Sequence, residues 1–265
     1  MLLAFDVGNS EIVLGVFLGS KLIKNWNMET MRHRTADEYG MIVNQLFEFE
    51  GLKLSDVKGV IVSTVVPSVL NSLQSMIQKY IGKRAMVVGP GIKTGLKIVY
   101  DDPAQVGADR IVNAVAALHK YGGPLIVIDF GTATTFCACT KDWSYIGGAI
   151  APGLKISADA LFEKTAKLPR VELDAPGSVI CKNTIEGMQA GLVFGHRGSV
   201  EYITLRMKEE LAAFDGSGEP VRVIASGGLA GLIETGTECI DVVDKLLTLD
   251  GLAFIYEKNR REIQA

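Results

Sequence analysis

Two short segments of the chain carry the same order of chemically useful residues. Residues 2–17 contain an apolar run, then Asp6, one apolar residue and Gly8, followed by a small polar turn and a second β-prone run. Residues 125–140 repeat this order around Asp129. Turn amides beside a glycine suit phosphate oxygens, and a carboxylate at a strand tip suits a hard cation or its waters. The repeat therefore predicts two similar strand–turn–strand units that together bind phosphate groups and a cation.

Each copy offers its own ligands. In the first, Gly8 permits close approach of the backbone, the amides of Asn9–Glu11 and the Ser10 hydroxyl suit phosphate oxygens, and Asp6 orients Mg²⁺ through water. In the second, Asp129 either ligates a cation or faces the first carboxylate across a cleft. Its turn also supplies hydroxyl groups, those of Thr132, Thr134 and Thr135. The plain alternatives are a hairpin turn and a threonine-capped β-bulge, and the pairing of the two copies favours a site over both.

A third candidate is the pair Asp109-Arg110, which stands at the start of a predicted helix with Asn113 one turn on. A hydroxyl that receives a phosphoryl group needs a carboxylate within hydrogen-bond reach, and the planar fork of arginine matches a substrate carboxylate. The same residues also read as ordinary charges in the first turn of a helix.

Two glycine-rich turns complete the set of candidates. Val223–Leu229 places a glycine pair between a strand and a helix, where bare backbone admits an adenine base or ribose, although this is also a common strand–helix turn. Gly147–Gly153 forms a tight strand-to-helix entry, whose glycines either admit substrate or allow close packing.

The elements that must position these residues repeat as well. Each half reads strand, strand, strand, helix, strand, helix, strand, helix, which with the Asp-x-Gly hairpins predicts an α/β fold. The expected architecture is a duplicated actin-like, ribonuclease-H-like fold with a central nucleotide cleft between domains 1–121 and 122–265. The expected strands are 2–7, 11–18, 21–28, 57–65, 85–88, 124–130, 133–140, 144–150, 221–225 and 240–243, and the expected helices begin near 35, 67, 108, 153, 184, 229 and 248.

Composition narrows the class of protein. A hydrophobic content of 48% supports sizeable cores, and a net charge of −3 argues against nucleic acid as the main partner. No stretch is apolar enough to span a membrane, and the first residues carry no visible secretory signal. The three histidines form no cluster, and we interpret Cys137 and Cys139 as buried thiols in preference to a zinc or redox site.

The motifs taken together resemble those of type III pantothenate kinases along essentially the whole chain. That family phosphorylates the terminal hydroxyl of pantothenate with ATP, the first step of coenzyme A synthesis. The resemblance implies a cytoplasmic homodimer that uses Mg²⁺-ATP and a monovalent cation, K⁺ or NH₄⁺. The matching segments are Asp6–Asn9, Arg34–Gly40, Val62–Ser68, Gly89–Gly95, Val106–Arg110, Asp129–Thr135, Gly147–Gly153 and Lys182–Thr184.

The resemblance also implies a role for each site residue. The base that accepts the hydroxyl proton falls on Asp109, and the ligand of the monovalent cation falls on Asp129. The ATP phosphate loop falls on Asp6, Val7, Gly8, Asn9, Ser10, Glu11, Ile12 and Val13, with Thr132 on the opposing hairpin. The pantothenate pocket falls on Tyr100, Gly107, Ala108, Asp109, Arg110 and Thr184.

The chain departs from the family pattern at a few positions. Ser10 and Glu11 stand where threonine and often asparagine are usual, Cys137 stands where an aspartate is common, and Ser226 replaces a frequent threonine. None of these changes removes a group that the chemistry requires. The alternatives are another phosphotransferase of the same architecture, such as a sugar kinase or polyphosphatase, and a nucleotide-sensing regulator without activity.

The helix expected over 184–213 bears on assembly. It carries more apolar residues than one small domain needs, so it either forms an internal core helix or packs against a two-fold mate. In the second case Thr184 would complete a pocket across the interface. The apolar residues in question are Met188, Leu192, Val193 and Val200.

Overall fold

The computed structural model describes residues 1–263, with side chains through Arg260. The chain forms two compact units. Unit 1 contains Met1–Gly95, Ala104–Ala116 and the helix that begins at Leu247, and unit 2 contains Leu96–Pro103 and Ala117–Leu246. We keep the division at residues 121 and 122 as a proposal about the duplicated halves of the sequence, because the compact units draw segments from both halves.

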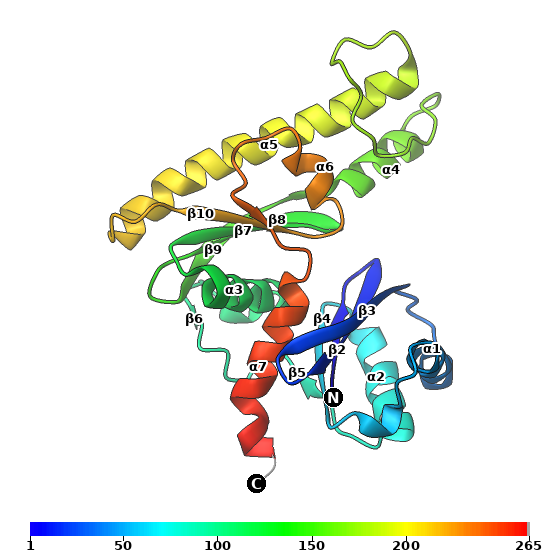
Figure 1. Cartoon of the computed structure of the whole chain (residues 1–265). Helices are drawn as coiled ribbons and strands as arrows, with labels where there is room; N and C mark the ends of the chain where they lie inside the picture. Colours follow the sequence, from blue (N-terminus) through cyan, green and yellow to red (C-terminus); the bar gives the residue numbers. More distant parts are fainter. Residues whose placement is uncertain (264–265) are drawn as a thin grey trace. The chain divides into compact units, whose positions relative to one another are not determined.

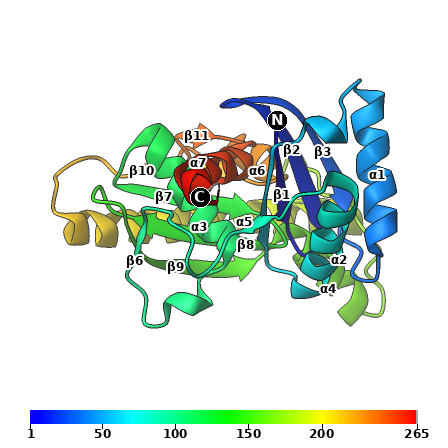
Figure 2. The same ribbon diagram turned by 90° about the horizontal axis from the view of Figure 1, so that it is seen from below.

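Unit 1 is built on one mixed sheet of order β3-β2-β1-β4-β5, in which β1 pairs antiparallel with β2 and parallel with β4. One face of the sheet packs on α1 and α2, and the other packs on α7 (Figure 1, Figure 2). The elements are β1 (Leu2–Val7), β2 (Glu11–Leu18), β3 (Lys21–Glu29), α1 (Ala36–Phe49), β4 (Gly59–Thr64), α2 (Pro67–Met76), β5 (Met86–Val87) and α7 (Leu247–Ile263), with short helical turns at Leu54–Asp56 and Ile77–Ile81.

Alternation along β1 explains how Asp6 is presented. Leu3, Phe5 and Val7 belong to the core under α1 and α2, so the intervening side chains project from the opposite face of the sheet. Asp6 is the last of these and is half-buried. The apolar residues of the strand therefore fix the direction in which the carboxylate points.

Unit 2 repeats this plan. Its sheet has the order β11-β10-β7-β8-β9-β6, so the order β9-β8-β7-β10-β11 matches that of the first sheet strand for strand. Ile126, Ile128 and Phe130 of β7 face a core shared with α4, α5 and α6, and Asp129 lies on the other face. The elements are β6 (Lys97–Ile98), β7 (Leu125–Phe130), β8 (Ala133–Cys139), β9 (Ser144–Pro152), α4 (Leu154–Lys164), α5 (Thr184–Asp215), β10 (Arg222–Ser226), α6 (Ala230–Glu234) and β11 (Val242–Val243).

The matching order of the two sheets confirms the duplicated two-domain α/β fold. The helix α3 (Ala108–Tyr121) follows the short turn Pro103–Gln105, begins in unit 1 and continues into unit 2. Every strand and helix expected from the sequence is present, with ends that move by a few residues. Among the described residues, the one strand that the sequence did not predict is β6, which pairs with the start of β9 through two residues.

Capping and packing contacts explain the ends of the unit 1 helices. Thr35 caps α1, because its hydroxyl accepts from the Glu38 amide while the Glu38 carboxylate accepts from the Thr35 amide. On the other face of the sheet, Leu249 of α7 packs against Gly15 and Tyr256 packs against Gly59. The Thr248 hydroxyl donates to the buried Asn113 of α3 at 2.7 Å, which ties the two helices together within unit 1.

No helix in the described part of the chain is both long and apolar enough to cross a membrane.

Candidate functional site

Hydrogen bonds hold one side of the turn between β1 and β2, and its other side is exposed to solvent. The Gly8 amide donates to the Glu11 carbonyl at 2.9 Å and closes the turn. Thr30, which directly follows β3, reinforces it, since its amide donates to the Ser10 carbonyl at 3.0 Å and its hydroxyl to the Gly8 carbonyl at 2.8 Å. Asn9, Ser10 and Glu11 are exposed. This rigid turn with a solvent-facing edge is the arrangement that the sequence predicts for binding phosphate oxygens.

The Asp109 carboxylate is pinned at the start of α3. Its Oδ1 atom accepts from the Arg110 amide at 2.8 Å, which satisfies one of the unpaired amides of the first helical turn. Gly107 makes room for it, because a Cβ at that position would lie 2.4 Å from the same oxygen. Both Asp109 and Arg110 remain half-exposed. A carboxylate and a guanidinium group are thus held side by side where a small acidic alcohol can reach both.

In unit 2, the Gly227 turn closes over the second aspartate. β10 pairs in parallel with β7, so Gly227 directly follows the residue opposite Asp129. Its φ is +93°, and a Cβ there would lie 2.6 Å from the Phe130 carbonyl oxygen and 2.7 Å from the Asp129 Oδ1 atom. Only glycine can occupy this position without a collision. The backbone just after β10 therefore passes close to a carboxylate oxygen and a carbonyl oxygen, which are the kinds of oxygen that a hard cation prefers as ligands.

The Gly153 turn packs on the tip of the same hairpin. The Gly153 amide donates to the Thr132 carbonyl at 3.2 Å, and a Cβ on Gly153 would lie 2.3 Å from that carbonyl oxygen. Along β9, a Cβ on Gly148 would lie 1.7 Å from the Phe136 carbonyl oxygen. Of the two readings of the Gly147–Gly153 motif, close packing is therefore the one that the structure shows at Gly148 and Gly153.

A groove of 820 Å³ runs from this turn between α4 and α5. Its walls are mostly apolar, and Thr184, the first residue of α5, lies on its rim. Asn183 caps that helix, since its side chain accepts from the Glu186 amide at 2.9 Å. The groove is lined by Pro152, Ile156, Ser157, Ala160, Leu161, Leu168, Thr184, Gly187, Met188, Gly191 and Leu192.

Tyr100 lies elsewhere in unit 2. Its ring centroid is 6.2 Å from that of the buried Tyr145, and a Cβ on Gly147 would lie 3.9 Å from the Tyr100 ring. Gly147 and Pro152 are separated by five positions of the extended strand β9, which is roughly 16 Å. Unit 2 of a single chain therefore does not bring Tyr100 and Thr184 together.

His196 of α5 is a site neighbour that the sequence reading missed. Its Nε2 atom lies 3.0 Å from the Thr134 hydroxyl, and its ring meets the Phe130 ring edge-on with centroids 6.0 Å apart. Burial lowers the pKa of the imidazole below its usual 6.5. No sequence signal links residues 134 and 196, since only the packing of α5 on the sheet joins them.

The neutral state of His196 leads to a pH prediction. The folded imidazole has the lower pKa, so the unfolded chain binds its proton first, and the free energy of unfolding should fall as pH decreases below about 6.5. We expect the stability of wild-type protein to fall more over this range than that of His196→Gln, measured by urea unfolding between pH 7.5 and 5. Substitution of the exposed His33 by Gln is the control and should follow wild type. Parallel curves for wild type and His196→Gln would refute the assignment.

The predicted site residues thus fall into two groups. Unit 1 holds the Asp6–Val13 turn and Gly107–Arg110, and unit 2 holds Tyr100, Asp129, Thr132 and Thr184. Within unit 2, the second hairpin, the Gly227 turn and the Gly153 turn meet at one end of the sheet. A cleft that joins the two groups stays a prediction.

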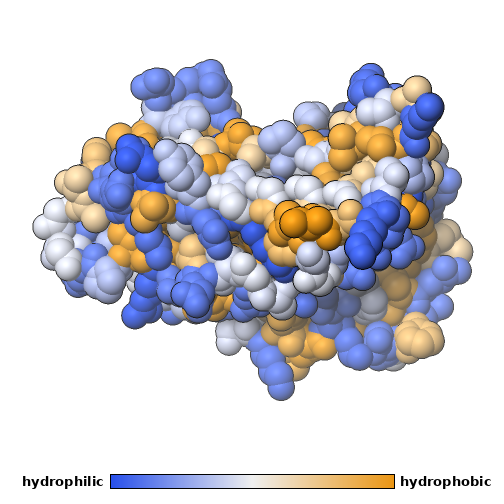
Figure 3. Space-filling model, turned by 90° about the horizontal axis from the view of Figure 1, so that it is seen from above, coloured by the Kyte–Doolittle hydropathy of each residue, from blue (hydrophilic) through white to orange (hydrophobic). Residues whose placement is uncertain are grey.

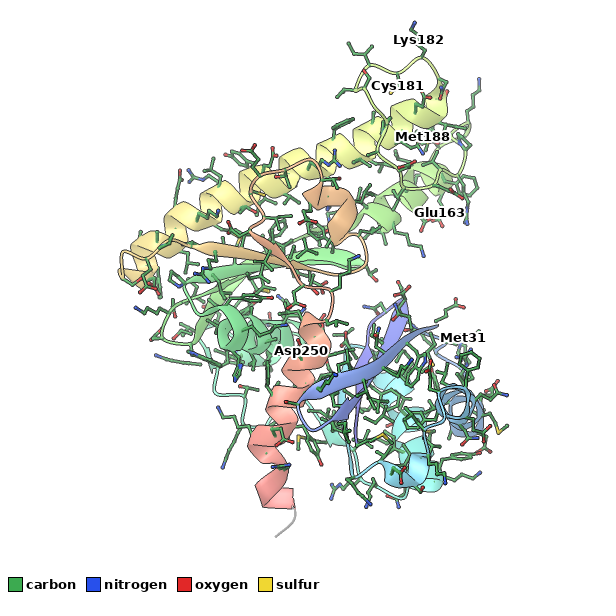
Figure 4. The ribbon with its side chains drawn as sticks, in the orientation of Figure 1. Met31, Glu163, Cys181, Lys182, Met188 and Asp250 are labelled. Atoms are coloured by element: carbon green, nitrogen blue, oxygen red, sulfur yellow. The ribbon has the colours of Figure 1, made fainter. Side chains whose placement is uncertain are left out.

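Of the two alternatives for α5, the structure shows an internal core role for the four apolar residues. Met188, Leu192, Val193 and Val200 are all buried within the chain. In Figure 4 the labelled Met188 lies near the start of α5, and the labelled Glu163 lies on the adjacent helix α4.

The two neighbouring cysteines of β8 are buried free thiols, as expected. Burial, with a smaller effect of the nearby Cys137, raises the pKa of Cys139 well above its usual value, so its thiol stays protonated. The described residues contain no cluster of three histidine, cysteine or acidic side chains that could hold a metal ion.

Comparison with solved structures supports the fold. Similar solved structures include a Baf family transcriptional activator, so described, from Campylobacter jejuni, with 18% identity, 98% of this chain and 99% of that chain covered, and a TM-score of 0.58. The ethanolamine utilization protein EutJ of Carboxydothermus hydrogenoformans matches at 18% identity over 96% and 89% of the two chains, with a TM-score of 0.53. Component A of (R)-2-hydroxyglutaryl-CoA dehydratase from Acidaminococcus fermentans matches at 15% over 98% of each chain, with a TM-score of 0.51. These identities support the shared fold alone.

The family assignment comes from the sequence. The family model of type III pantothenate kinase matches residues 2–206, which include both hairpins, the Gly107–Arg110 segment and Thr184. The chain therefore belongs to the type III pantothenate kinase family, the kinases that phosphorylate pantothenate with ATP in coenzyme A synthesis.

Proposed function

We propose that the Asp109-Arg110 pair carries the reaction of this chain. The supporting observation is the half-exposed Asp109 carboxylate, held by the Arg110 amide and given room by Gly107. In this scheme Asp109 accepts the proton of the terminal hydroxyl of pantothenate while that oxygen forms its bond to the γ-phosphorus of ATP. The bond from that phosphorus to the ADP oxygen breaks, and ADP leaves. An ATP-dependent assay with pantothenate and a panel of other alcohols tests the substrate.

Binding of the two substrates uses the remaining site residues. The turn from Asp6 to Val13 receives the phosphates of ATP, with Thr132 contributing from the second hairpin, and Mg²⁺ enters bound to the nucleotide. Arg110 pairs with the carboxylate of pantothenate. Tyr100, Gly107, Ala108 and Thr184 complete the pantothenate pocket.

Asp129 is the proposed ligand of a monovalent cation, K⁺ or NH₄⁺. Asp129 Oδ1 and the Phe130 carbonyl oxygen both lie beside Gly227, and a carboxylate oxygen and a carbonyl oxygen are the kinds of ligand that suit such an ion. A bound cation would supply positive charge that offsets the repulsion between this carboxylate and the phosphates. We therefore expect the ion to act mainly on ATP binding.

A titration checks this role. The apparent affinity of wild-type protein for ATP should increase with K⁺ at constant ionic strength, with choline as the balancing cation. Asp129→Ala should bind ATP with no dependence on K⁺, and Asp142→Ala, a change of another unit 2 aspartate, should keep the wild-type dependence. An ATP affinity of wild type that does not respond to K⁺ would show that the assignment is wrong.

We also propose that the working form is a homodimer that packs through α5. With its buried side committed to the core, the helix presents an outer face on which added Cβ atoms would meet nothing, followed by the exposed side chains of Tyr202 and Leu205. The glycines of this face are Gly187, Gly191, Gly195 and Gly198. Figure 3 views the molecule from the side of α5, where apolar and neutral residues interrupt the hydrophilic surface.

The separation of Tyr100 and Thr184 supports this proposal, because a second chain could supply the missing wall of the pantothenate pocket. Tyr202→Glu should shift the protein toward monomer in light scattering and lower its pantothenate affinity, since a charge in the interface is costly to bury. Glu201→Gln, next to it on the exposed helix, should remain dimeric. A wild-type protein that is monomeric and fully active at assay concentration would exclude the homodimer.

The proposed location is the cytoplasm. All four cysteines are free thiols, which suits a reducing compartment.

A further inference from the structure

We propose that each aspartate of the duplicated hairpins is oriented by a buried serine on the neighbouring parallel strand. Ser63 of β4 orients Asp6, and Ser226 of β10 orients Asp129. The inference deepens the proposed function, since it rests on the roles given there to Asp6 and Asp129. It adds two positioning residues that the sequence pattern did not assign to this task.

The register of the two sheets places each serine directly opposite its aspartate. Asp6 pairs with Ser63 across β1 and β4, and Asp129 pairs with Ser226 across β7 and β10. Residues directly opposite each other on neighbouring strands project from the same face of the sheet, about 4.8 Å apart. The pairing continues past Asp6, because the Val65 amide donates to the Val7 carbonyl at 3.1 Å. The same aspartate–serine neighbours thus occur in both halves of the fold.

Both serines are buried. Ser63 is 0% exposed, and its Oγ atom has no hydrogen-bond partner. Ser226 is 3% exposed. A buried hydroxyl without a partner is disfavoured and calls for an explanation, such as a group that is bound only in the working state. The turn after β4 does not need Ser63, because the Thr64 hydroxyl already accepts from the Val66 amide at 2.9 Å.

The aspartate carboxylate and the serine hydroxyl are complementary as acceptor and donor. A carboxylate accepts hydrogen bonds at several positions, whereas a serine hydroxyl has one proton to donate and turns about a single bond. A hydroxyl that donates to one carboxylate oxygen leaves the other directed at a cation or its water. In unit 2 the next residue is Gly227, so the same segment supplies both the hydroxyl and a glycine whose backbone lies close to Asp129 Oδ1. The serines would therefore donate to the aspartates when Mg²⁺-ATP or K⁺ binds, and so keep each carboxylate directed at the bound cation.

The test compares Ser63→Ala and Ser226→Ala with wild type in two measurements. In Ser63→Ala the thermal midpoint without ligands should be unchanged or higher, because the Ser63 hydroxyl makes no hydrogen bond that the change could remove. By calorimetry, Mg²⁺-ATP affinity should fall about tenfold in Ser63→Ala, the usual effect of removing a hydrogen bond to a charged group. In Ser226→Ala the K⁺ concentration that gives half of the effect on ATP affinity should rise by a similar factor, and in Ser63→Ala it should not.

Two further sets of variants make the result specific. Ser63→Thr and Ser226→Thr keep the hydroxyl and should restore ligand binding. Thr204→Val is the matched control, because Thr204 of α5 is also 0% exposed with an unpartnered hydroxyl, and this change should leave Mg²⁺-ATP and K⁺ binding as in wild type.

Several outcomes would overturn the proposal. Wild-type ligand affinity in both alanine variants, a lower midpoint of Ser63→Ala without ligands, or an equal loss of affinity in Thr204→Val would each show that the serines have no positioning role. Asp6→Asn and Asp129→Ala separate this from the proposed function. If those two variants lose ligand binding while the serine variants do not, only the positioning role fails, and if they bind normally, the roles of the aspartates themselves are wrong.

Discussion

Asp109→Asn should reduce turnover by roughly 10²–10⁴-fold, the usual effect of losing a positioned general base. The substitution keeps the size of the side chain and an oxygen that can accept from the Arg110 amide, so the start of α3 should stay intact. Only the ability to take the proton of the substrate hydroxyl is removed. Steady-state kinetics with saturating ATP and pantothenate measure the effect, and calorimetry should show nearly unchanged ATP affinity.

The chain provides a matched control for this change. Asp37 is the second residue of α1, as Asp109 is the second residue of α3, and both follow an alanine. The Asp37 Oδ1 atom accepts hydrogen bonds from the Lys79 ammonium group at 2.7 Å and from the Tyr80 hydroxyl at 2.8 Å. Neither partner is a predicted site residue. Asp37→Asn should therefore turn over at the wild-type rate. Near wild-type turnover in Asp109→Asn would remove Asp109 from the role of base.

Arg110→Lys should weaken pantothenate binding by about 1.5–3 kcal/mol, although the charge is kept. The planar guanidinium group forms two parallel hydrogen bonds to a carboxylate, and a lysine ammonium group cannot reproduce that fork. Arg110 is half-exposed at the first turn of α3, where its Nη2 atom donates to the Gln105 carbonyl at 3.4 Å, so a bound carboxylate has access to it. Isothermal titration with pantothenate measures the loss.

A second titration tests whether the loss of affinity depends on the substrate carboxylate. An analogue of pantothenate in which the carboxylate is an amide should bind wild type and Arg110→Lys with similar affinity, because the fork then has no anion to match. Arg84→Lys changes an exposed arginine elsewhere in unit 1 and should leave pantothenate affinity unchanged. Equal affinity of wild type and Arg110→Lys for pantothenate would contradict the pairing.

Local signals determined most of the secondary structure. The pattern of β-prone runs and glycine turns places β1 and β2 at the residues found, since a tight hairpin is fixed by a few neighbouring residues. The start of α1 is equally local, because Thr35 and Glu38 satisfy each other's backbone amides within one turn. The repeated order of elements then specified the duplicated fold, and the motifs specified the family.

Long-range packing decided what the sequence could not. The two-residue strand β6 pairs with the edge that β9 offers, and a strand of two residues is too short to be predicted from its own sequence. The periodicity of α5 shows apolar faces but not what covers them, so the burial of Met188 and Val200 inside the chain became visible only in the folded unit.

The candidate site divides in the same way. The sequence by itself predicted Asp6, Asp129 and the Asp109-Arg110 pair as site residues, because their chemistry is tied to short motifs at strand and helix ends. It could not determine that Ser63 lies opposite Asp6, that Gly227 faces Asp129 Oδ1 or that His196 meets Thr134. These neighbours are between 57 and 98 positions apart in the chain. Strand register and helix packing set such contacts, and both are settled only when the cores of the two units form.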